Sequence, residues 1–200
     1  MVRAKLFGSI TINSKYGETM FPDFPDIQAP VAPWTALVLQ FASLYSLDPK
    51  IIAALVYQES KGNSAAHRYE DAFYIKYVAK KTSSTLLGYV PSNSGQLPTL
   101  DTEKRDRAYS YGLAQVMGQT ARELGYKKND LLNLCIIPAD GLAYGCAYLK
   151  KKFDATSSAI PQIERYRTAL LGYNGGSDPD YDDKVLSHIT SGKYLEIATV

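Results

Sequence analysis

Apolar residues recur with the period of an α-helix in several stretches after residue 33, and typical helix starts and stops bound these stretches. Asp48-Pro49 is typical of a helix start, because an Asp side chain caps free amides and proline fits the first turn. Gly125 and Asn174-Gly175-Gly176 are typical of helix ends. The predicted helices cover about residues 34–45, 49–60 and 112–124, two more begin at residues 138 and 161, and a last short one covers about 180–190.

The same spacing predicts which face of each helix is buried. The inward residues are Leu37, Phe41 and Leu44 in the first helix, and Leu113, Val116 or Met117, Thr120 or Ala121, and Leu124 in the third. They are Leu142, Cys146, Leu149 and Phe153 in the fourth, and Ile163, Tyr166, Leu170 and Tyr173 in the fifth. Faces of this kind bury against one another, so the pattern predicts a compact all-α domain.

Residues 61–109 interrupt the helical pattern and are rich in loops. Within them we expect a helix at about 71–80, followed by a polar segment with Gly, Ser and Pro. A small β element at 82–100 is the most β-structure that the pattern indicates, which would make the fold α+β at most.

The first 33 residues differ from the rest. A short strand is predicted near residues 6–12, and four prolines between Phe21 and Pro33 are incompatible with a helix or a central strand. We therefore expect an extended proline-rich arm, 1–33, followed by a helical domain, 34–200.

Composition and charge exclude several classes of protein. The chain is 46% hydrophobic and has a formal net charge of +2, so it lacks the basic surface typical of nucleic-acid binding. No apolar run approaches the roughly 18 residues of a membrane span, and the first 12 residues do not resemble a signal peptide. Cys135 and Cys146 are expected to be free thiols, and two His with two Cys predict neither a metal site nor a cofactor.

Glu59 is the most informative single residue. It lies three, four and seven positions after Val56, Leu55 and Ile52, so its carboxyl is expected on the core side of the last helical turn. Burial and the negative end of the helix dipole both raise the pKa of a carboxyl, as the general acid of a glycosidase requires. The alternative is a structural Glu paired with a core arginine such as Arg122 or Arg167.

Three blocks of sequence share an order known from one enzyme family. They are Gln58-Glu59-Ser60, Ser110 to Met117 (SYGLAQVM), and Leu171 to Gly176 (LGYNGG). Together they resemble the catalytic domain of the soluble lytic transglycosylases, a lysozyme-like fold shared with goose-type lysozymes. Thr120-Ala121, Pro138, Tyr148-Leu149 and Tyr181 extend the resemblance, which covers about residues 34–190.

The resemblance implies a chemistry for Glu59. As the sole acid/base, it would protonate the leaving oxygen of the β-1,4 bond between N-acetylmuramic acid (MurNAc) and N-acetylglucosamine (GlcNAc) in peptidoglycan. The substrate's own acetamido group would stabilise the oxocarbenium-like centre, and Glu59 would then accept the proton of the C6 hydroxyl as a 1,6-anhydro ring closes. No cofactor is implied.

The resemblance also implies substrate-binding roles for five residues. Ser60 would hydrogen-bond the sugar, or only cap its helix, and Gln115 would line the cleft or be a solvated side chain. Tyr173 and Asn174 would close the cleft beside Glu59, Tyr173 by a hydrogen bond near its carboxyl and Asn174 also as a helix cap. Tyr181 would be a further cleft wall or packing.

Two departures from the family pattern matter. Ala114 stands where the family usually has Met, and about fifty residues separate Ser60 from Tyr111, more than in the compact form of the family. His67 to Glu70 and Ser110 to Gly112 resemble the longer form of phage and prophage transglycosylases. In this insert Glu70 would orient substrate or pair with Arg68. One of Asp101, Glu103 and Asp106 could instead activate water opposite Glu59, which would give a muramidase.

Location follows as an expectation from the substrate. Peptidoglycan lies outside the cytoplasm, and a virion-borne enzyme acting on the host cell wall in the periplasm would reach it. The arm, 1–33, would then bind a structural protein of a phage tail or, in the alternative, of a secretion apparatus. A structural virion protein that keeps the fold without the activity is the remaining alternative.

Overall fold

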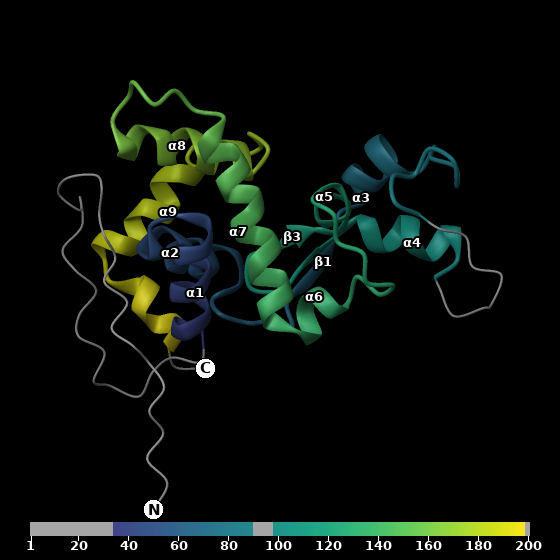
Figure 1. Cartoon of the computed structure of the whole chain (residues 1–200), viewed down its shortest axis with the longest axis horizontal. Helices are drawn as coiled ribbons and strands as arrows, with labels where there is room; N and C mark the ends of the chain where they lie inside the picture. The colour runs from purple at the N-terminus through teal and green to yellow at the C-terminus, as the bar shows by residue number, and fades with distance from the viewer. Residues whose placement is uncertain (1–33, 90–97, 199–200) are drawn as a thin grey trace, which may run out of the picture.

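The computed structural model describes residues 34–89 and 98–198. These residues form two lobes on either side of the long helix α7 (Pro138–Asp154), as Figure 1 shows. The predicted arm and the strand expected near residues 6–12 lie outside the described residues, so the division into 1–33 and 34–200 stays a prediction.

The helical lobe holds four further α-helices: α1 (Thr35–Tyr45), α2 (Pro49–Ser60), α8 (Gln162–Tyr173) and α9 (Tyr181–Thr190). The short 3-10 helix η2 (Lys193–Ala198) also packs against α2. Helix α2 begins as predicted, because the Asp48 side chain accepts a hydrogen bond of 2.8 Å from the Lys50 amide and Pro49 fills the first turn. Its residues from Ile51 to Val56 are almost fully buried, so α2 is the centre of this lobe.

The second lobe carries a small antiparallel sheet in the order β1-β2-β3. Its strands are β1 (His67–Tyr69), β2 (Tyr109–Tyr111) and β3 (Val116–Met117). Around them lie α3 (Asp71–Phe73), the π-helix η1 (Tyr74–Val78), α4 (Leu100–Arg107), α5 (Gly118–Glu123) and α6 (Asn133–Ile136). The described chain is thus mostly helical with one small sheet, as the fold class predicted.

The position of the sheet corrects one prediction. The described residues 82–89 and 98–100, where the β element was expected, contain no strand. The strands instead lie on both sides of that segment, because His67 to Tyr69 and Tyr109 to Tyr111 pair with each other across it.

The predicted helix at 112–124 is wrong in its first half. Residues 112–115 form a turn in which Gly112 and Gln115 have positive φ angles of 69° and 44°, and β3 follows before α5 begins at Gly118. A Cβ at Gly112 would lie 2.5 Å from the Leu134 carbonyl oxygen, so only glycine fits at position 112 of this turn. The predicted stop at Gly125 is confirmed by its φ of 94° just after α5.

The inward face of α1 is also rotated from the prediction. Val38, Phe41 and Ala42 are buried, whereas Leu44 is 66% exposed. Val38, Phe41 and Ala42 keep the i, i+3, i+4 spacing of a buried helix face. The prediction was wrong at Leu44, an apolar residue that lies outside this face. The faces of α7 and α8 were predicted correctly, since Leu142, Cys146, Leu149 and Phe153 as well as Tyr166, Leu170 and Tyr173 are buried.

Two further expectations can be checked in the described part of the chain. Cys135 and Cys146 are free and buried, as predicted. Among residues 34–89 and 98–198, no helix is long and apolar enough to cross a membrane.

Candidate active site

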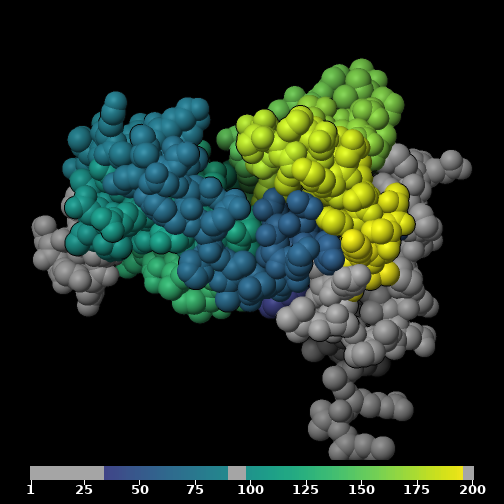
Figure 2. Space-filling view, turned by 180° about the vertical axis from the view of Figure 1, so that it is seen from behind, coloured from purple at the N-terminus to yellow at the C-terminus, as the bar shows by residue number. Residues whose placement is uncertain are grey.

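A cavity of about 310 Å³ lies between the two lobes. The space-filling view in Figure 2 shows a hollow between the teal lobe and the green and yellow helices. Glu59 from α2 lines the cavity together with residues of the sheet lobe and the end of α8. The other lining residues are Arg68, Glu70, Phe73, Ser110, Gln115, Val116, Met117, Thr120, Tyr148, Tyr173, Asn174, Gly175 and Ser177.

The carboxyl of Glu59 has the environment of a general acid. It lies in the last turn of α2, four and three positions after the buried residues Leu55 and Val56. Burial is the largest effect and raises its pKa from 4.5 to about 7, assisted by the negative charge of Glu70. A hydrogen bond from Tyr181 and the positive charge of Arg68 act in the opposite direction, and the pKa of about 7 is the result of all these effects.

Glu59 does not form the structural ion pair that was the alternative. Arg122 binds Glu103 at 2.8 Å, and Arg167 binds Asp182 at 2.6 Å and Asp183 at 2.5 Å. The hydrogen bond that Glu59 does receive comes from the hydroxyl of Tyr181 on α9.

Tyr181, and not Tyr173, is the tyrosine whose hydroxyl bonds the Glu59 carboxyl. Tyr173 was expected to hydrogen-bond near the Glu59 carboxyl, but its hydroxyl donates to the Ala114 carbonyl oxygen at 2.6 Å. Tyr181, which was expected as cleft wall or packing, contacts Glu59 instead. Tyr173 nonetheless lines the cavity, and its bond to Ala114 ties α8 to the turn at 112–115.

Ser60 and Gln115 use their donors within the protein. The Ser60 hydroxyl donates to the Leu113 carbonyl oxygen at 2.8 Å. Gln115 Nε2 donates to the carbonyl oxygens of Ala66 and Gly112, both at 2.9 Å. Gln115 lines the cavity from a turn rather than from a helix, and it can offer a ligand only its amide oxygen, which already accepts from Ser110 at 2.9 Å.

Asn174 differs from these two residues. It is the C-cap residue of α8 and lines the cavity, and its Nδ2 is buried with no hydrogen-bond partner in the described part of the chain. A buried amide without a partner costs free energy unless a ligand or water satisfies it. Asn174 therefore has an unused donor, and the residue lies at the cavity wall.

The comparison with known families decides what this arrangement is. Residues 37–188 match the family described as the transglycosylase SLT domain, which is more than half of the 200 residues. The chain belongs to this family. A search among curated proteins found no match.

The SLT domain makes the protein a lytic transglycosylase enzyme with peptidoglycan as its substrate. Family membership confirms the resemblance drawn from the three sequence blocks. In the structure, all three blocks reach the cavity: Glu59 from the first, Ser110 and Gln115 from the second, and Tyr173 and Asn174 from the third.

The carboxylates that would turn this transglycosylase domain into a hydrolase are not in its cavity. None of Asp101, Glu103 and Asp106 lines it. Burial and the charge of Glu103 raise the pKa of Asp106 to about 6, but this group lies on α4 in the second lobe. Among the described lining residues, Glu70 is the other carboxylate, and it pairs with Arg68 at 2.6 Å, as one of the two alternatives predicted.

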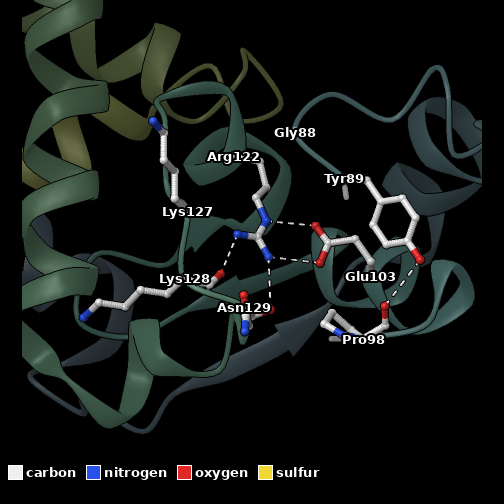
Figure 3. A pocket seen from close by; sticks show the side chains of 8 residues that line it. All are labelled: Gly88, Tyr89, Pro98, Glu103, Arg122, Lys127, Lys128 and Asn129. Atoms are coloured by element: carbon white, nitrogen blue, oxygen red, sulfur yellow. Dashed lines mark hydrogen bonds and ion pairs between the residues drawn. The ribbon is translucent and has the colours of Figure 1, made fainter. Parts of the chain in front are cut away.

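Glu103 has a structural role in the SLT domain. Its carboxylate accepts hydrogen bonds from Arg107 at 2.7 Å and from Arg122 at 2.8 and 3.0 Å. Figure 3 shows Arg122 between Glu103 and the backbone of the segment around Lys128 and Asn129, beside a small pocket of about 70 Å³. Since Arg122 donates five hydrogen bonds within the protein, it has no donor left for a ligand.

Sequence reasoning missed several cavity residues. Phe73, Met117, Tyr148 and Arg68 line the cavity, but none was assigned to the site. Arg68 and Met117 lie on the edge strands of the sheet, which the helical pattern did not predict. The alternation of β1 was too short to be read as a strand from the sequence.

Proposed function

We propose that this enzyme cleaves the β-1,4 bond between MurNAc and GlcNAc with formation of a 1,6-anhydro ring, and that Glu59 is its acid and base. The observation that carries the proposal is the Glu59 carboxyl in the inter-lobe cavity, with burial raising its pKa to about 7. A carboxyl with this pKa is protonated in a large share of molecules at neutral pH and can still ionise in the next step.

The proposed reaction needs one proton donor and no water. Glu59 donates its proton to the glycosidic oxygen as the bond from that oxygen to C1 of MurNAc breaks. The acetamido oxygen of the same sugar stabilises the positive charge at C1. The Glu59 carboxylate then takes the proton of the C6 hydroxyl, whose oxygen bonds to C1, so the acid is regenerated.

The surroundings of Glu59 support assigned roles for the other site residues. We assign Tyr181 the orientation of the carboxyl and Asn174 a hydrogen bond from Nδ2 to a sugar oxygen. Tyr173 and Gln115 form part of the wall on which the sugar lies. Together with Ser60, which does not line the cavity, they hold the turn at 112–115 in place.

Ring closure is favoured over hydrolysis by the state of the second carboxylate. A hydrolase that inverts the anomeric centre needs an ionised carboxylate free to activate water. Glu70 already accepts a hydrogen bond from Arg68. Mass spectrometry of the products tests this choice, because anhydro-muropeptides lack one water relative to the reducing ends that a muramidase would release.

We also propose that the enzyme is a virion component that acts on the host cell wall in the periplasm and is attached through residues 1–33. The segments His67 to Glu70 and Ser110 to Gly112, which resemble the longer phage and prophage form, support this proposal. A chain without residues 1–30 should stay folded and active on isolated wall but lose its retention in the assembly. Unchanged retention of the shortened chain would contradict attachment through residues 1–33. Retention of the full chain by a secretion apparatus instead of a virion would favour the alternative location in the cell envelope.

A further inference from the structure

The sheet turns one row of side chains toward the cavity. Arg68 pairs with Ser110, and Ser110 pairs with Met117, across the three strands. Side chains at paired positions lie on the same face of a sheet, and all three of these residues line the cavity. The neighbouring positions of β1, His67 and Tyr69, are the ones whose rings contact Tyr109, at centroid distances of 5.9 and 5.1 Å.

Arg68 has hydrogen-bond donors that the protein does not use. Its Nε donates to Glu70 Oε1 at 2.6 Å, and within the described chain Nη1 and Nη2 form no hydrogen bond. The Arg68 side chain is 76% exposed, whereas that of Glu70 is 31% exposed. The backbone amide of Glu70 is itself bonded to the Ala108 carbonyl at 2.9 Å. Glu70 thus binds the Nε side of the guanidinium and leaves the edge formed by Nη1 and Nη2 open.

The charge of Arg68 acts in the same cavity as the catalytic acid. Arg68 lowers the pKa of Glu59 and Glu70 raises it, so both groups are within electrostatic range of the acid. The sugar rings of the glycan are uncharged. The acidic groups along a peptidoglycan strand are carboxylates, either of the stem peptide or of the lactyl group where that peptide has been removed.

We propose that Arg68 is a specificity-determining residue that binds a carboxylate of the peptidoglycan strand through Nη1 and Nη2, with Glu70 as its positioning residue. This inference rests on the proposed function, because it names the part of that substrate which the sheet lobe recognises. A guanidinium edge with two parallel donors fits a carboxylate in the bidentate arrangement that lysine cannot provide.

Binding of this carboxylate has a consequence for the acid. A negative group on Arg68 offsets the charge that lowers the Glu59 pKa, so the protonated form of Glu59 is favoured when the charged substrate is bound. Substrate charge and the acidity of the catalytic group are therefore coupled through Arg68.

The test compares two forms of one substrate. Calorimetry measures the affinity of the protein for glycan strands with free carboxylates and for the same strands after their carboxylates have been converted to methylamides. The protein carries Glu59→Gln, which should slow cleavage, and binding is measured in the same way whichever product the unmutated enzyme forms. We expect about tenfold tighter binding of the charged strands. Addition of Arg68→Gln should reduce that ratio to about one, and Arg68→Lys should keep only part of it.

The control is Arg105→Gln, which removes a positive charge from an exposed position of α4 outside the cavity. It should keep the wild-type ratio, and thermal unfolding should show that all variants are folded. Strands without stem peptides show which carboxylate Arg68 binds. If charged strands of this kind still bind more tightly than their methylamide form, the lactyl carboxylate is the ligand; if the difference vanishes, the ligand is a carboxylate of the stem peptide.

Equal binding of the two forms, or a ratio that Arg68→Gln leaves unchanged, overturns the inference. Failure of the proposed function would show differently, as reducing-end products, or no cleavage product at all, from both forms with the unmutated enzyme. The same ratio should appear in kcat/KM of that enzyme, mostly through KM, because the contact lies away from the bond that breaks.

Discussion

Tyr181 on α9 donates a hydrogen bond to the carboxyl of Glu59 on α2, across 122 positions of the sequence. Burial raises the pKa of Glu59 to about 7, and the Tyr181 bond is the largest effect in the opposite direction. The hydroxyl stabilises the ionised carboxylate, whereas burial stabilises the neutral acid. The two largest effects on the pKa of this proposed acid therefore oppose each other, and one of them comes from a helix far along the chain.

Tyr181→Phe should shift the pH profile upward. Loss of the hydroxyl removes an interaction that lowers the Glu59 pKa, so the pKa should rise above about 7. Since the reaction needs the protonated acid, the loss of activity with rising pH should move to a higher pH, while kcat falls because the carboxyl is less well oriented. The measurement is kcat/KM as a function of pH.

Tyr166→Phe is the matched control for Tyr181→Phe. It removes another buried tyrosine hydroxyl, which accepts a hydrogen bond of 2.7 Å from the Asp48 amide and lies outside the cavity. It should cost about 1 kcal/mol of unfolding free energy and leave the pH profile in place. A shift of equal size in both variants would show that the Tyr181 hydroxyl has no special effect on Glu59.

Glu59→Gln should lower the rate of wall cleavage by at least about a hundredfold, as expected for loss of an acid/base group. The amide oxygen can still accept the Tyr181 hydrogen bond, so the fold should be kept. Glu164→Gln changes an exposed carboxylate of α8 and should retain full activity. If Glu59→Gln cleared walls as well as the unmutated protein, Glu59 would not be the acid and base of the reaction.

The same Glu59→Gln variant should be more stable at alkaline pH. The folded-state pKa of about 7 lies above the unfolded value near 4.5, so the unmutated protein loses stability as the pH rises through this window. Gln does not ionise, and the gain should therefore be near zero below pH 4.5 and reach up to about 3 kcal/mol above pH 7. Urea unfolding at pH 4 and pH 8 measures it, and an equal difference at both values would contradict the raised pKa.

Glu103→Ala should destabilise the second lobe strongly. The change leaves Arg107, which is fully buried, and Arg122 without their shared carboxylate. Breaking a buried ion pair in this way costs about 3–5 kcal/mol, to be measured by urea unfolding. Glu123→Ala, at an exposed position of α5, should stay within about 0.5 kcal/mol of the unmutated protein.

Gly145→Ala should disturb the contact between α7 and the turn that carries Gln115. A Cβ at this position would lie 2.3 Å from Ala114 Cβ and 3.3 Å from the Tyr173 hydroxyl. We expect a loss of about 1–3 kcal/mol in unfolding free energy and lower activity, because the turn and Tyr173 must move.

Gly172→Ala provides the comparison for Gly145→Ala. Its Cβ would meet only the side chain of Lys152, at 3.3 Å from Cδ, which can move aside. Alanine favours a helix over glycine by about 1 kcal/mol, so this variant should be as stable as the unmutated protein or more stable. A comparable loss in both variants would mean that the close approach at Gly145 does not decide the effect.

The sequence predicted the helical lobe well and the sheet lobe poorly, for a physical reason. Helices α2, α7 and α8 have long apolar stripes and a proline at their start, and α2 also has the Asp48 cap. Local signals of this kind do not depend on distant partners. The strands have only two or three residues, and β1 pairs with β2 across forty or more positions, so this pairing is decided by contacts far along the chain. Helix α4 was missed because it is polar and its buried face consists of charged residues, among them Glu103 and Arg107.

The candidate site divides in the same way. Glu59 could be located because its neighbours on one helix predicted its burial, and the burial accounts for its pKa. The exchange between Tyr173 and Tyr181 could not be foreseen, because it depends on how α8 and α9 pack against α2. Arg68 was left out of the site because its position facing the cavity follows only from the register of β1 and β2.

The packing of α9 against α2 makes the environment of Glu59 depend on a helix that is synthesised late. During synthesis, Glu59 leaves the ribosome more than a hundred residues before Tyr181 does. Until α9 docks, the side chain of Glu59 stays nearer to water and behaves as an ordinary carboxylic acid, ionised at neutral pH. A nascent or truncated polypeptide that ends before α9 should therefore cleave glycan strands poorly, even though it contains Glu59.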